Sequence, residues 1–313
     1  MAAGPGSPDL LDRSASGGAG GGTTMLARRL LEDVRRKSGI RHERAVERKL
    51  ERILAVIPSA ALDGWVALIE ASPPDSPDWL SLIESLTVHE TYFFRDPPQQ
   101  EQLRRTVLPA LIKAAAAEGR RNLRLWSAGC ASGEEPYTLA ILALEALADL
   151  RHARRTGAGM ETDWTVDVLG TDISRHMVTL AKGGAYGGEG LGPFRDLPPD
   201  YLPWFVPLEG GPEGGGHGLR RVRADARRLV RFRQHNLVSD APPETGFDLV
   251  CCRNVLIYFD EEGRRRAQSQ LASSLAPGGW LVLGASDRPD RPELFERVMG
   301  ERALAYRLKG APR

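Results

Sequence analysis

Residues 123–136 read LRLWSAGCASGEEP, and this stretch decides the fold. An apolar run, residues 123–129, passes through a turn of small residues into a helical pattern that begins at Glu134 and continues to Leu150. A buried strand that enters a helix through small residues is typical of the first unit of a doubly wound α/β sheet. Small side chains let the backbone of such a turn approach a ligand closely, although a turn that serves packing alone remains the alternative.

The same order of strand and helix repeats toward the C-terminus. Strands are expected at residues 166–172, 247–254 and 280–286. Helices are expected at residues 174–182, after a serine cap, and at 261–275, where Pro277-Gly278-Gly279 closes the helix. Because these strand sequences are apolar rather than alternating, we expect a parallel sheet covered by helices on both faces. A last strand, residues 303–308, is expected at an edge of the sheet.

The spacing of glycines in the first turn argues against two common phosphate sites. Gly129 and Gly133 do not have the spacing of the dinucleotide motif G-x-G-x-x-G, and no Gly-Lys-Ser/Thr follows them. An oxidoreductase of the NAD type is therefore set aside. Glu134 and Glu135 at the helix entry would repel a pyrophosphate, and they suit a cationic ligand better.

Asp172 ends the second predicted strand. A carboxylate at this place in such a sheet can accept hydrogen bonds from both hydroxyls of a ribose. An acid that only interacts with the dipole of the following helix is the alternative. A turn that disfavours phosphate beside an acid that fits ribose indicates S-adenosylmethionine, whose sulfonium and ammonium groups are both positive.

The rest of the chain divides into a tail, a helical region and an insert. Residues 1–23 are rich in Gly, Ala and Ser and are predicted to form a disordered tail. Residues 24–86 are predicted to form a small helical domain, and residues 87–313 a second domain with an insert at about 184–234. Within the insert, residues 210–218 are predicted to lie at a hairpin tip. The helical domain carries an Arg-rich face formed by Arg28, Arg29, Arg35, Arg36, Lys37 and Arg41. We interpret this face as solvated, and docking to an acidic partner is the alternative.

Composition excludes several classes of protein. The 313 residues include 42 basic and 41 acidic side chains, so the net charge of +1 gives no long-range field for nucleic acid. No apolar run reaches the roughly 20 residues of a membrane span, and the start lacks the layout of a secretion signal. Three cysteines cannot form a disulfide framework. We therefore expect a cytoplasmic protein that binds no nucleic acid and no metal and does not insert into a membrane.

Six segments together resemble a known family in their order and spacing. They are HETYFFRD (89–96), LRLWSAGCASGEEPYTLA (123–140), VLGTDIS (168–174), FRQHNL (232–237), FDLVCCRNVLIYFD (247–260) and LAPGGWLVLGAS (275–286). Over about residues 25–310 the chain resembles the CheR family of chemotaxis-receptor glutamate methyltransferases. The resemblance implies a Rossmann-like α/β domain at 87–313 that binds S-adenosylmethionine. It also implies a small β-subdomain inserted at about 184–234 and an all-α domain in front.

The resemblance also implies a cofactor site. Glu134 would face the amino group of S-adenosylmethionine and Asp172 its ribose, while Asn236 and Leu237 would flank the adenine. Arg253 and Asn254 would close the site near the methionine moiety. The linker would supply His89, Thr91 and Arg95. His89 stands where the family usually has Asn, and Ala285-Ser286-Asp287 replaces the family's His-Ser-Glu.

The reaction that the resemblance implies forms methyl esters on glutamates of methyl-accepting chemotaxis receptors. A glutamate is already ionised at neutral pH, so no general base is expected. Tyr258 is the candidate for positioning the acceptor, within an apolar wall formed by Tyr92, Phe93, Phe94, Tyr258 and Phe259. The receptor's cytoplasmic helices would be the partner, and by hypothesis its tail peptide would pair with the insert. Two alternatives stay open: an acceptor outside chemotaxis, and a cofactor-binding regulatory module without activity.

Overall fold

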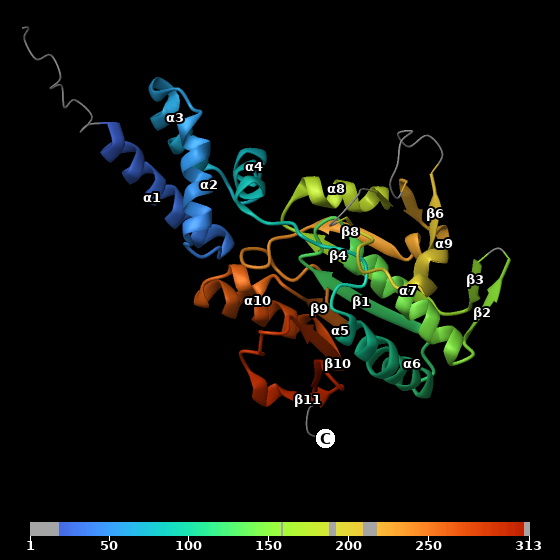
Figure 1. Ribbon diagram of the computed structural model, residues 1–313. Helices are drawn as coiled ribbons and strands as arrows, with labels where there is room; N and C mark the ends of the chain where they lie inside the picture. The colour runs from blue at the N-terminus through green and yellow to red at the C-terminus, as the bar shows by residue number, and fades with distance from the viewer. Residues whose placement is uncertain (1–18, 158, 188–191, 209–217, 310–313) are drawn as a thin grey trace, which may run out of the picture.

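A seven-stranded sheet lies at the centre of the computed structural model, which describes residues 19–157, 159–187, 192–208 and 218–309 (Figure 1). The order across the sheet is β11-β12-β10-β9-β1-β4-β8. In chain order the strands are β1 (Asn122–Ala128), β4 (Thr165–Asp172), β8 (Val230–Gln234), β9 (Phe247–Cys252), β10 (Leu275–Leu283), β11 (Phe295–Met299) and β12 (Leu304–Leu308). Neighbours from β10 to β8 are parallel, whereas β12 runs antiparallel to β10 and to β11. The α/β fold is confirmed, with the Rossmann-like strand order 3-2-1-4-5-7-6 when these seven are counted along the chain.

Strand β1 is the point at which the strand order reverses. The chain leaves β1 for β4 and β8 on one side, and returns later to place β9 and β10 on the other side. Ligands of open α/β sheets bind outside the carboxyl ends of the strands at such a point. Here those ends carry the turn after Ala128, the residue Asp172 and the segment after Cys252.

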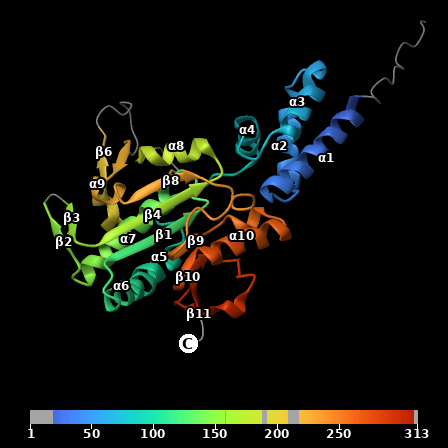
Figure 2. The ribbon, with the colours of Figure 1, turned by 180° about the vertical axis from the view of Figure 1, so that it is seen from behind.

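Alternate side chains of the central strands pack into two cores. Leu123 and Leu125 of β1 belong to the core that holds the buried residues of α6 (Leu108–Ala117) and α7 (Glu134–Asp149). Trp126 and Ala128 belong to the core on the side of α10 (Glu261–Ser274). Helix α8 (Arg175–Gly183) lies beside α7, since Tyr137 Oη donates to the carbonyl of Ala181 at 2.9 Å. Helices therefore cover both faces of the sheet, as predicted, and the view from behind shows the same arrangement (Figure 2).

The C-terminal part differs from the predictions at two points. Pro277-Gly278-Gly279 was expected to close the helix before a strand at 280–286, but it lies within β10, where the pairing with β9 shifts register between Leu275 and Trp280. A bulge of this kind lets a strand absorb residues that do not fit a regular ladder. Residues 304–308 form β12, which pairs on both sides and is not at an edge. The edge strand is β11, whose sequence FERVM carries too little apolar pattern to predict a strand.

The insert contains a small antiparallel sheet with the order β5-β7-β6. Its strands are β5 (Ala185–Tyr186), β6 (Phe205–Pro207) and β7 (Arg220–Val222), with the turns η2 (Pro199–Trp204) and α9 (Ala224–Arg227) beside them. Strands β6 and β7 pair as predicted, and most of the predicted hairpin tip, residues 209–217, lies outside the described residues. A second hairpin, β2 (Ala153–Thr156) and β3 (Gly159–Thr162), was not predicted because its sequence is polar and does not alternate.

Four helices come first in the described part of the chain: α1 (Ala19–Ser38), α2 (Arg44–Ala55), α3 (Ser59–Ala71) and α4 (Pro77–Leu86). They enclose their own apolar core, which includes Leu30, Leu50 and Trp79. We call residues 19–86 the helical unit. Helix α1 begins at Ala19, inside the stretch predicted to be a disordered tail. These first residues extend a helix whose packing against the apolar core begins at Leu26. Residues 1–18 lie outside the described residues.

Most of the Arg-rich face of the helical unit is neutralised within the chain. Arg29 pairs with Glu70, and Arg36 and Lys37 pair with Asp33. Arg35 pairs with Glu32 and with Asp260, and Arg41 with Glu43. These ion pairs favour the interpretation of a solvated face over that of a free basic surface.

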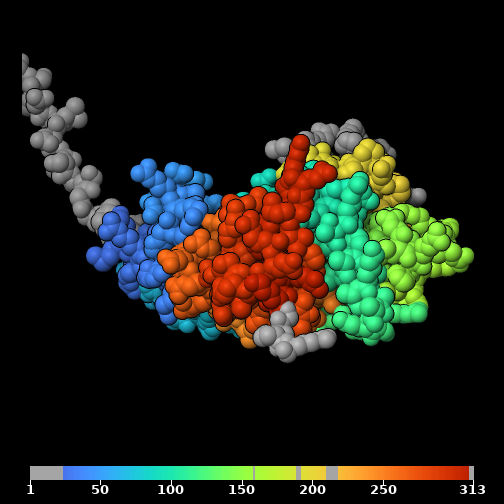
Figure 3. All heavy atoms as spheres, turned by 90° about the horizontal axis from the view of Figure 1, so that it is seen from below, coloured from blue at the N-terminus to red at the C-terminus, as the bar shows by residue number. Residues whose placement is uncertain are grey.

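A further helical run connects the linker to the sheet, from α5 (Pro97–Gln102) through the π-helical turn η1 (Leu103–Val107) into α6. In the space-filling view this run lies beside the C-terminal strands, with the helical unit at one end of the molecule and the β2–β3 hairpin at the other (Figure 3). Within the described residues, none of the helices is long and apolar enough to span a membrane.

Candidate cofactor site

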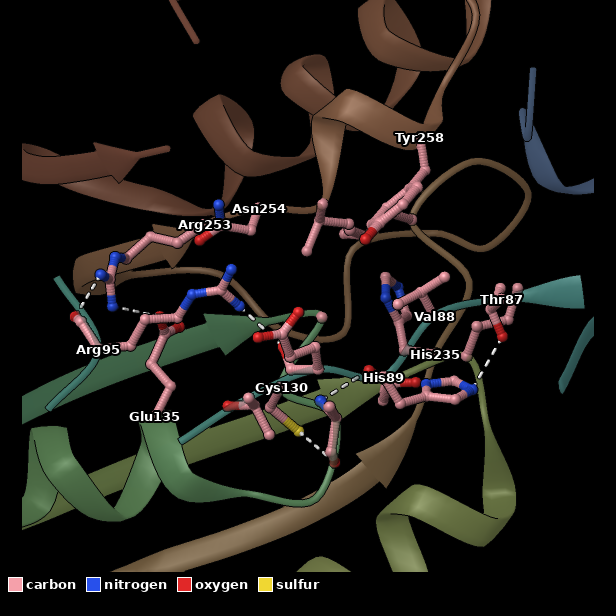
Figure 4. Close-up of a pocket in the computed structure, with 18 of the residues that line it drawn as sticks. Thr87, Val88, His89, Arg95, Cys130, Glu135, His235, Arg253, Asn254 and Tyr258 are labelled. Atoms are coloured by element: carbon pink, nitrogen blue, oxygen red, sulfur yellow. Dashed lines mark hydrogen bonds and ion pairs between the residues drawn. The ribbon is translucent and has the colours of Figure 1, made fainter. Parts of the chain in front are cut away.

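A pocket lies at the carboxyl ends of β1, β4 and β9, where the strand order reverses (Figure 4). Its wall contains eight of the nine residues predicted to bind the cofactor, together with Tyr258. The eight are His89, Thr91, Arg95, Asp172, Asn236, Leu237, Arg253 and Asn254. Segments separated by more than 160 positions along the chain are thus brought together at one place.

Asp172 organises the turn that follows β1. One carboxylate oxygen, Oδ2, accepts a hydrogen bond from the backbone N–H of Ala131 at 2.8 Å, and Oδ1 accepts from the N–H of Ser174 at 3.0 Å. Burial raises the pKa of Asp172, and the two N–H groups act in the opposite direction by stabilising its charge. Each carboxylate oxygen has a second lone pair, so both can still accept from a ligand hydroxyl.

The turn itself is tightly packed against the segment after β9. The N–H groups of Gly129 and Cys130 both donate to the carbonyl of Thr171, at 2.7 and 2.9 Å. Gly129 has a φ of 77°, and a Cβ there would lie 2.3 Å from Cγ2 of Val255. Only glycine fits this position, because a side chain would push the turn away from one wall of the pocket.

The two glutamates of the turn have different surroundings. Glu135 lines the pocket, accepts from Ser127 Oγ at 2.7 Å and pairs with Arg253 Nη1 at 3.0 Å. Glu134, predicted to face the cofactor's amino group, is not among the lining residues; its Oε2 accepts from Ser132 Oγ at 2.8 Å. Neighbours on a helix point roughly 100° apart, so only one of two adjacent carboxylates can face a given wall. The prediction named Glu134, whereas the structure places Glu135 at the wall of the pocket.

The buried carboxyl of Glu134 should make stability depend on pH. Burial raises its pKa from 4.5 to about 7. The unfolded chain therefore releases this proton near pH 4.5 and the folded chain only near pH 7, so stability falls as the pH rises between these values. We expect Glu134→Gln to gain up to about 3 kcal/mol relative to the natural protein between pH 5 and pH 8.

Urea unfolding at a series of pH values measures this difference, with the exposed Glu296→Gln as the control variant. Parallel stability curves for the natural protein and Glu134→Gln would contradict the raised pKa.

Arg253 holds the linker against the sheet rather than pointing freely into the pocket. Its side chain is 3% exposed, and its guanidinium donates to Gln99 Oε1, to Glu135 and, at 2.6 Å, to the carbonyl of Arg95. Gln99 in turn donates to the carbonyl of Leu283 at 2.8 Å. This buried network fixes the position of the Arg95 backbone beside the pocket.

Asn236 was expected to read an edge of the adenine, but its side chain is occupied within the protein. Nδ2 donates to the carbonyl of Lys37 at 3.1 Å, and Oδ1 accepts from the N–H of Val238 at 2.9 Å. Asn236 therefore shapes the pocket by tying it to the helical unit.

Phe93 is also placed differently from the prediction of an apolar wall. Tyr92, Phe94, Tyr258 and Phe259 line the pocket, whereas Phe93 packs into the insert against Tyr186, Phe194 and Phe205. The wall also contains residues that were not predicted from the sequence, among them Ser38, Ile40, Glu135 and His235. Glu135 and His235 lie in two of the quoted motif segments, whereas Ser38 and Ile40 lie in none.

Comparison with known proteins gives one family. The family model for the S-adenosylmethionine-binding domain of CheR methyltransferase matches residues 89–304. Chemotaxis protein methyltransferase 1 of Pseudomonas aeruginosa is 36% identical over 229 residues, which are 73% of this chain and 77% of that protein. The chemotaxis protein methyltransferase of Vibrio parahaemolyticus is 34% identical over 231 residues, 74% of this chain and 76% of that protein. A probable chemotaxis protein methyltransferase of Rhizobium etli is 31% identical over 247 residues, 78% of this chain and 84% of that protein.

Proposed function

Because this chain belongs to the CheR methyltransferase family, we propose that it transfers methyl groups from S-adenosylmethionine to glutamate side chains of chemotaxis receptors. The family makes it an S-adenosylmethionine-dependent methyltransferase; the acceptor is the proposed part. The observation that carries the proposal is the extent of the likeness to proteins named chemotaxis methyltransferases, about three quarters of both chains.

The residues of the pocket fit the cofactor by their chemistry. Asp172 offers two acceptor oxygens to a ribose, and Glu135, which also pairs with Arg253, offers carboxylate oxygens as acceptors to an ammonium group. Bound there, S-adenosylmethionine would supply an electrophilic methyl group on a positive sulfur. We propose that the linker residues His89, Thr91 and Arg95, with Leu237 and Asn254, complete the cofactor's surroundings. We propose also that the chain is organised as a helical domain at 24–86 and a catalytic domain at 87–313.

Methyl transfer to a carboxylate requires the protein to align the acceptor oxygen with the methyl group, and it requires no general base. The cofactor would supply the methyl group: as a glutamate oxygen bonded to the methyl carbon, the bond from that carbon to sulfur would break, and a positive and a negative charge would cancel. An apolar wall favours a step that removes charge, and Tyr92, Phe94 and Phe259 provide it. In-line positioning contributes roughly 7–11 kcal/mol in favourable systems.

Tyr258 is the residue that we propose to position the acceptor. It lines the pocket, yet 36% of it is exposed, as a residue at the entrance should be. We expect Tyr258→Ala to lower kcat/KM for the receptor by about 10- to 100-fold and to leave cofactor affinity within about threefold. Tyr258→Phe keeps the ring and is the matched variant.

Initial rates at varied receptor concentration, with calorimetry for the cofactor, measure these two quantities separately. An unchanged kcat/KM in Tyr258→Ala would remove Tyr258 from the acceptor site.

The proposed function is tested with S-adenosylmethionine labelled in its methyl group and a purified cytoplasmic receptor fragment. We expect label on the fragment that alkali releases as methanol, because esters hydrolyse in base and N-methyl groups do not. A fragment whose acceptor glutamates are replaced by alanine is the control. Cofactor binding without transfer to any acceptor would instead support a regulatory module. Transfer to another sensory protein, but not to the receptor, would support an acceptor outside chemotaxis.

A further inference from the structure

A second cavity adjoins the cofactor pocket, between the run from α5 to η1, helix α7, strand β2 and the turn η2 of the insert. Its volume is about 620 Å³, within the usual range of small-molecule sites. Phe94 and Gln100 line both this cavity and the cofactor pocket, so they form a wall between the two. Helix α7 also joins them, because Thr138 lines the cofactor pocket and Leu142, one turn further along, lines the second cavity.

The lining of the second cavity carries a net negative charge. Its four carboxylates and two guanidinium groups are those of Glu101, Glu145, Asp149, Asp200, Arg104 and Arg155. Both guanidinium groups are already paired with carboxylates: Arg104 Nε donates to Glu101 at 3.0 Å, and Arg155 pairs with Glu145. The charge that remains is therefore negative, which favours a cation and disfavours an anion.

Three acceptors of this lining have no donor among the described residues. The carboxylates of Asp149 and Asp200 are exposed, and neither makes a hydrogen bond or an ion pair there. Gln100 is 6% exposed, and its Nε2 donates to the carbonyl of Arg95 at 2.8 Å, but its buried Oε1 has no partner. A buried acceptor without a donor is costly, so this oxygen indicates a donor from outside the chain.

An aromatic pair supplies the apolar part of the second cavity. The rings of Phe94 and Tyr201 lie with their centroids 4.1 Å apart, and both line the cavity. Phe94 has a φ of 57°, a conformation that a residue other than glycine keeps only where its surroundings hold it. Here the surroundings are Tyr201 on one side and Thr138 Oγ1, which accepts from the N–H of Phe94 at 3.3 Å.

We propose that the second cavity binds a small organic cation with a guanidinium or amine group, and that this binding strengthens the cofactor site. Asp149 and Asp200 hold the charge, Gln100 Oε1 accepts from an N–H of the cation, and its apolar part lies on Phe94 and Tyr201. Contacts from this side hold Phe94 in the conformation that forms the wall of the cofactor pocket. By linkage, the cofactor strengthens binding of the cation by the same factor.

The test of the site is calorimetric titration of the full chain with agmatine, which carries a guanidinium and an ammonium group on a short aliphatic chain. At physiological ionic strength, where long-range attraction is screened, we expect a Kd below about 1 mM. Asp149→Asn and Asp200→Asn should each raise Kd by about three- to fivefold, and the double variant by about tenfold or more. Both positions are exposed, so these variants keep the fold.

Asp196→Asn is the matched control, because Asp196 is exposed in the same part of the insert and does not line the cavity. Its Kd for agmatine should change by less than about twofold. No binding by the natural protein, equal Kd values for the double variant and Asp196→Asn, or tighter binding of inorganic phosphate than of agmatine would overturn the proposal.

The coupling is measured as the Kd of S-adenosylhomocysteine with and without saturating agmatine. We expect agmatine to lower this Kd by about fivefold or more in the natural protein, and the response to disappear in the double variant. A Kd that agmatine leaves unchanged or raises would overturn the coupling. Neither titration uses a receptor, so the results are independent of the proposed acceptor.

Discussion

Replacing Asp172 by alanine is expected to abolish measurable binding of S-adenosylmethionine and S-adenosylhomocysteine. The substitution removes the two oxygens proposed to accept from the ribose hydroxyls, and hydrogen bonds to a charged group each contribute roughly 1.5–3 kcal/mol. The loss of about 3 kcal/mol or more corresponds to a Kd raised at least about 100-fold. The N–H groups of Ala131 and Ser174 also lose their acceptor, so the turn that forms the pocket is loosened.

Calorimetric titration of both ligands measures this effect. Asp167→Ala is the control, since Asp167 lies on the same strand but pairs with Arg231 at the surface and does not line the pocket. Asp172→Asn keeps one acceptor oxygen and should fall between the two. Micromolar binding that persists in Asp172→Ala would place the cofactor elsewhere.

Replacing Arg253 by alanine is expected to destabilise the protein by roughly 3–5 kcal/mol, the usual effect of removing one member of a buried ion pair. The substitution leaves Glu135 without its counter-ion and Gln99 without its donor, and it releases the carbonyl of Arg95. Because the linker is then no longer held against the sheet, cofactor affinity should fall with stability.

Urea unfolding followed by circular dichroism measures the stability change. Arg307→Ala, at an exposed position on β12, is the control and should change stability by less than about 1 kcal/mol. Arg253→Lys keeps the charge but cannot reach three acceptors in fixed directions, so it should recover only part of the loss. A stable Arg253→Ala protein that binds cofactor normally would show that the network is dispensable.

The fold could be predicted where residues act locally. The buried strands ending at Ala128 and Asp172 are apolar throughout, and Ser174 begins α8 as a cap, accepting from the N–H of Met177. The prediction was wrong where pairing partners decide the outcome. The Gly-Gly at 278–279 sits in a strand because β9 is beside it, and residues 304–308 are internal because β11 pairs on their far side.

The candidate site shows the same limit. Asp172 and Arg253 stand at strand ends within recognisable motifs, so the sequence alone singled them out. Ser38 and Ile40 carry no such motif, and only the docking of the helical unit brings them to the pocket. Asn236 was predicted as a contact, but the structure shows its amide bound to Lys37, a residue almost 200 positions earlier. Contacts over such separations leave no periodic pattern in a sequence.

The place of β12 sets the order in which this sheet can be completed during synthesis. Residues 304–308 fit between β10 and β11, so the edges of these strands that face β12 stay unpaired until β12 has left the ribosome. At roughly 5–20 residues per second, the nascent chain carries these open edges for seconds. Unpaired edges pair with strands of other chains and promote aggregation. Strand β12 is therefore required for folding without aggregation as well as for the finished sheet.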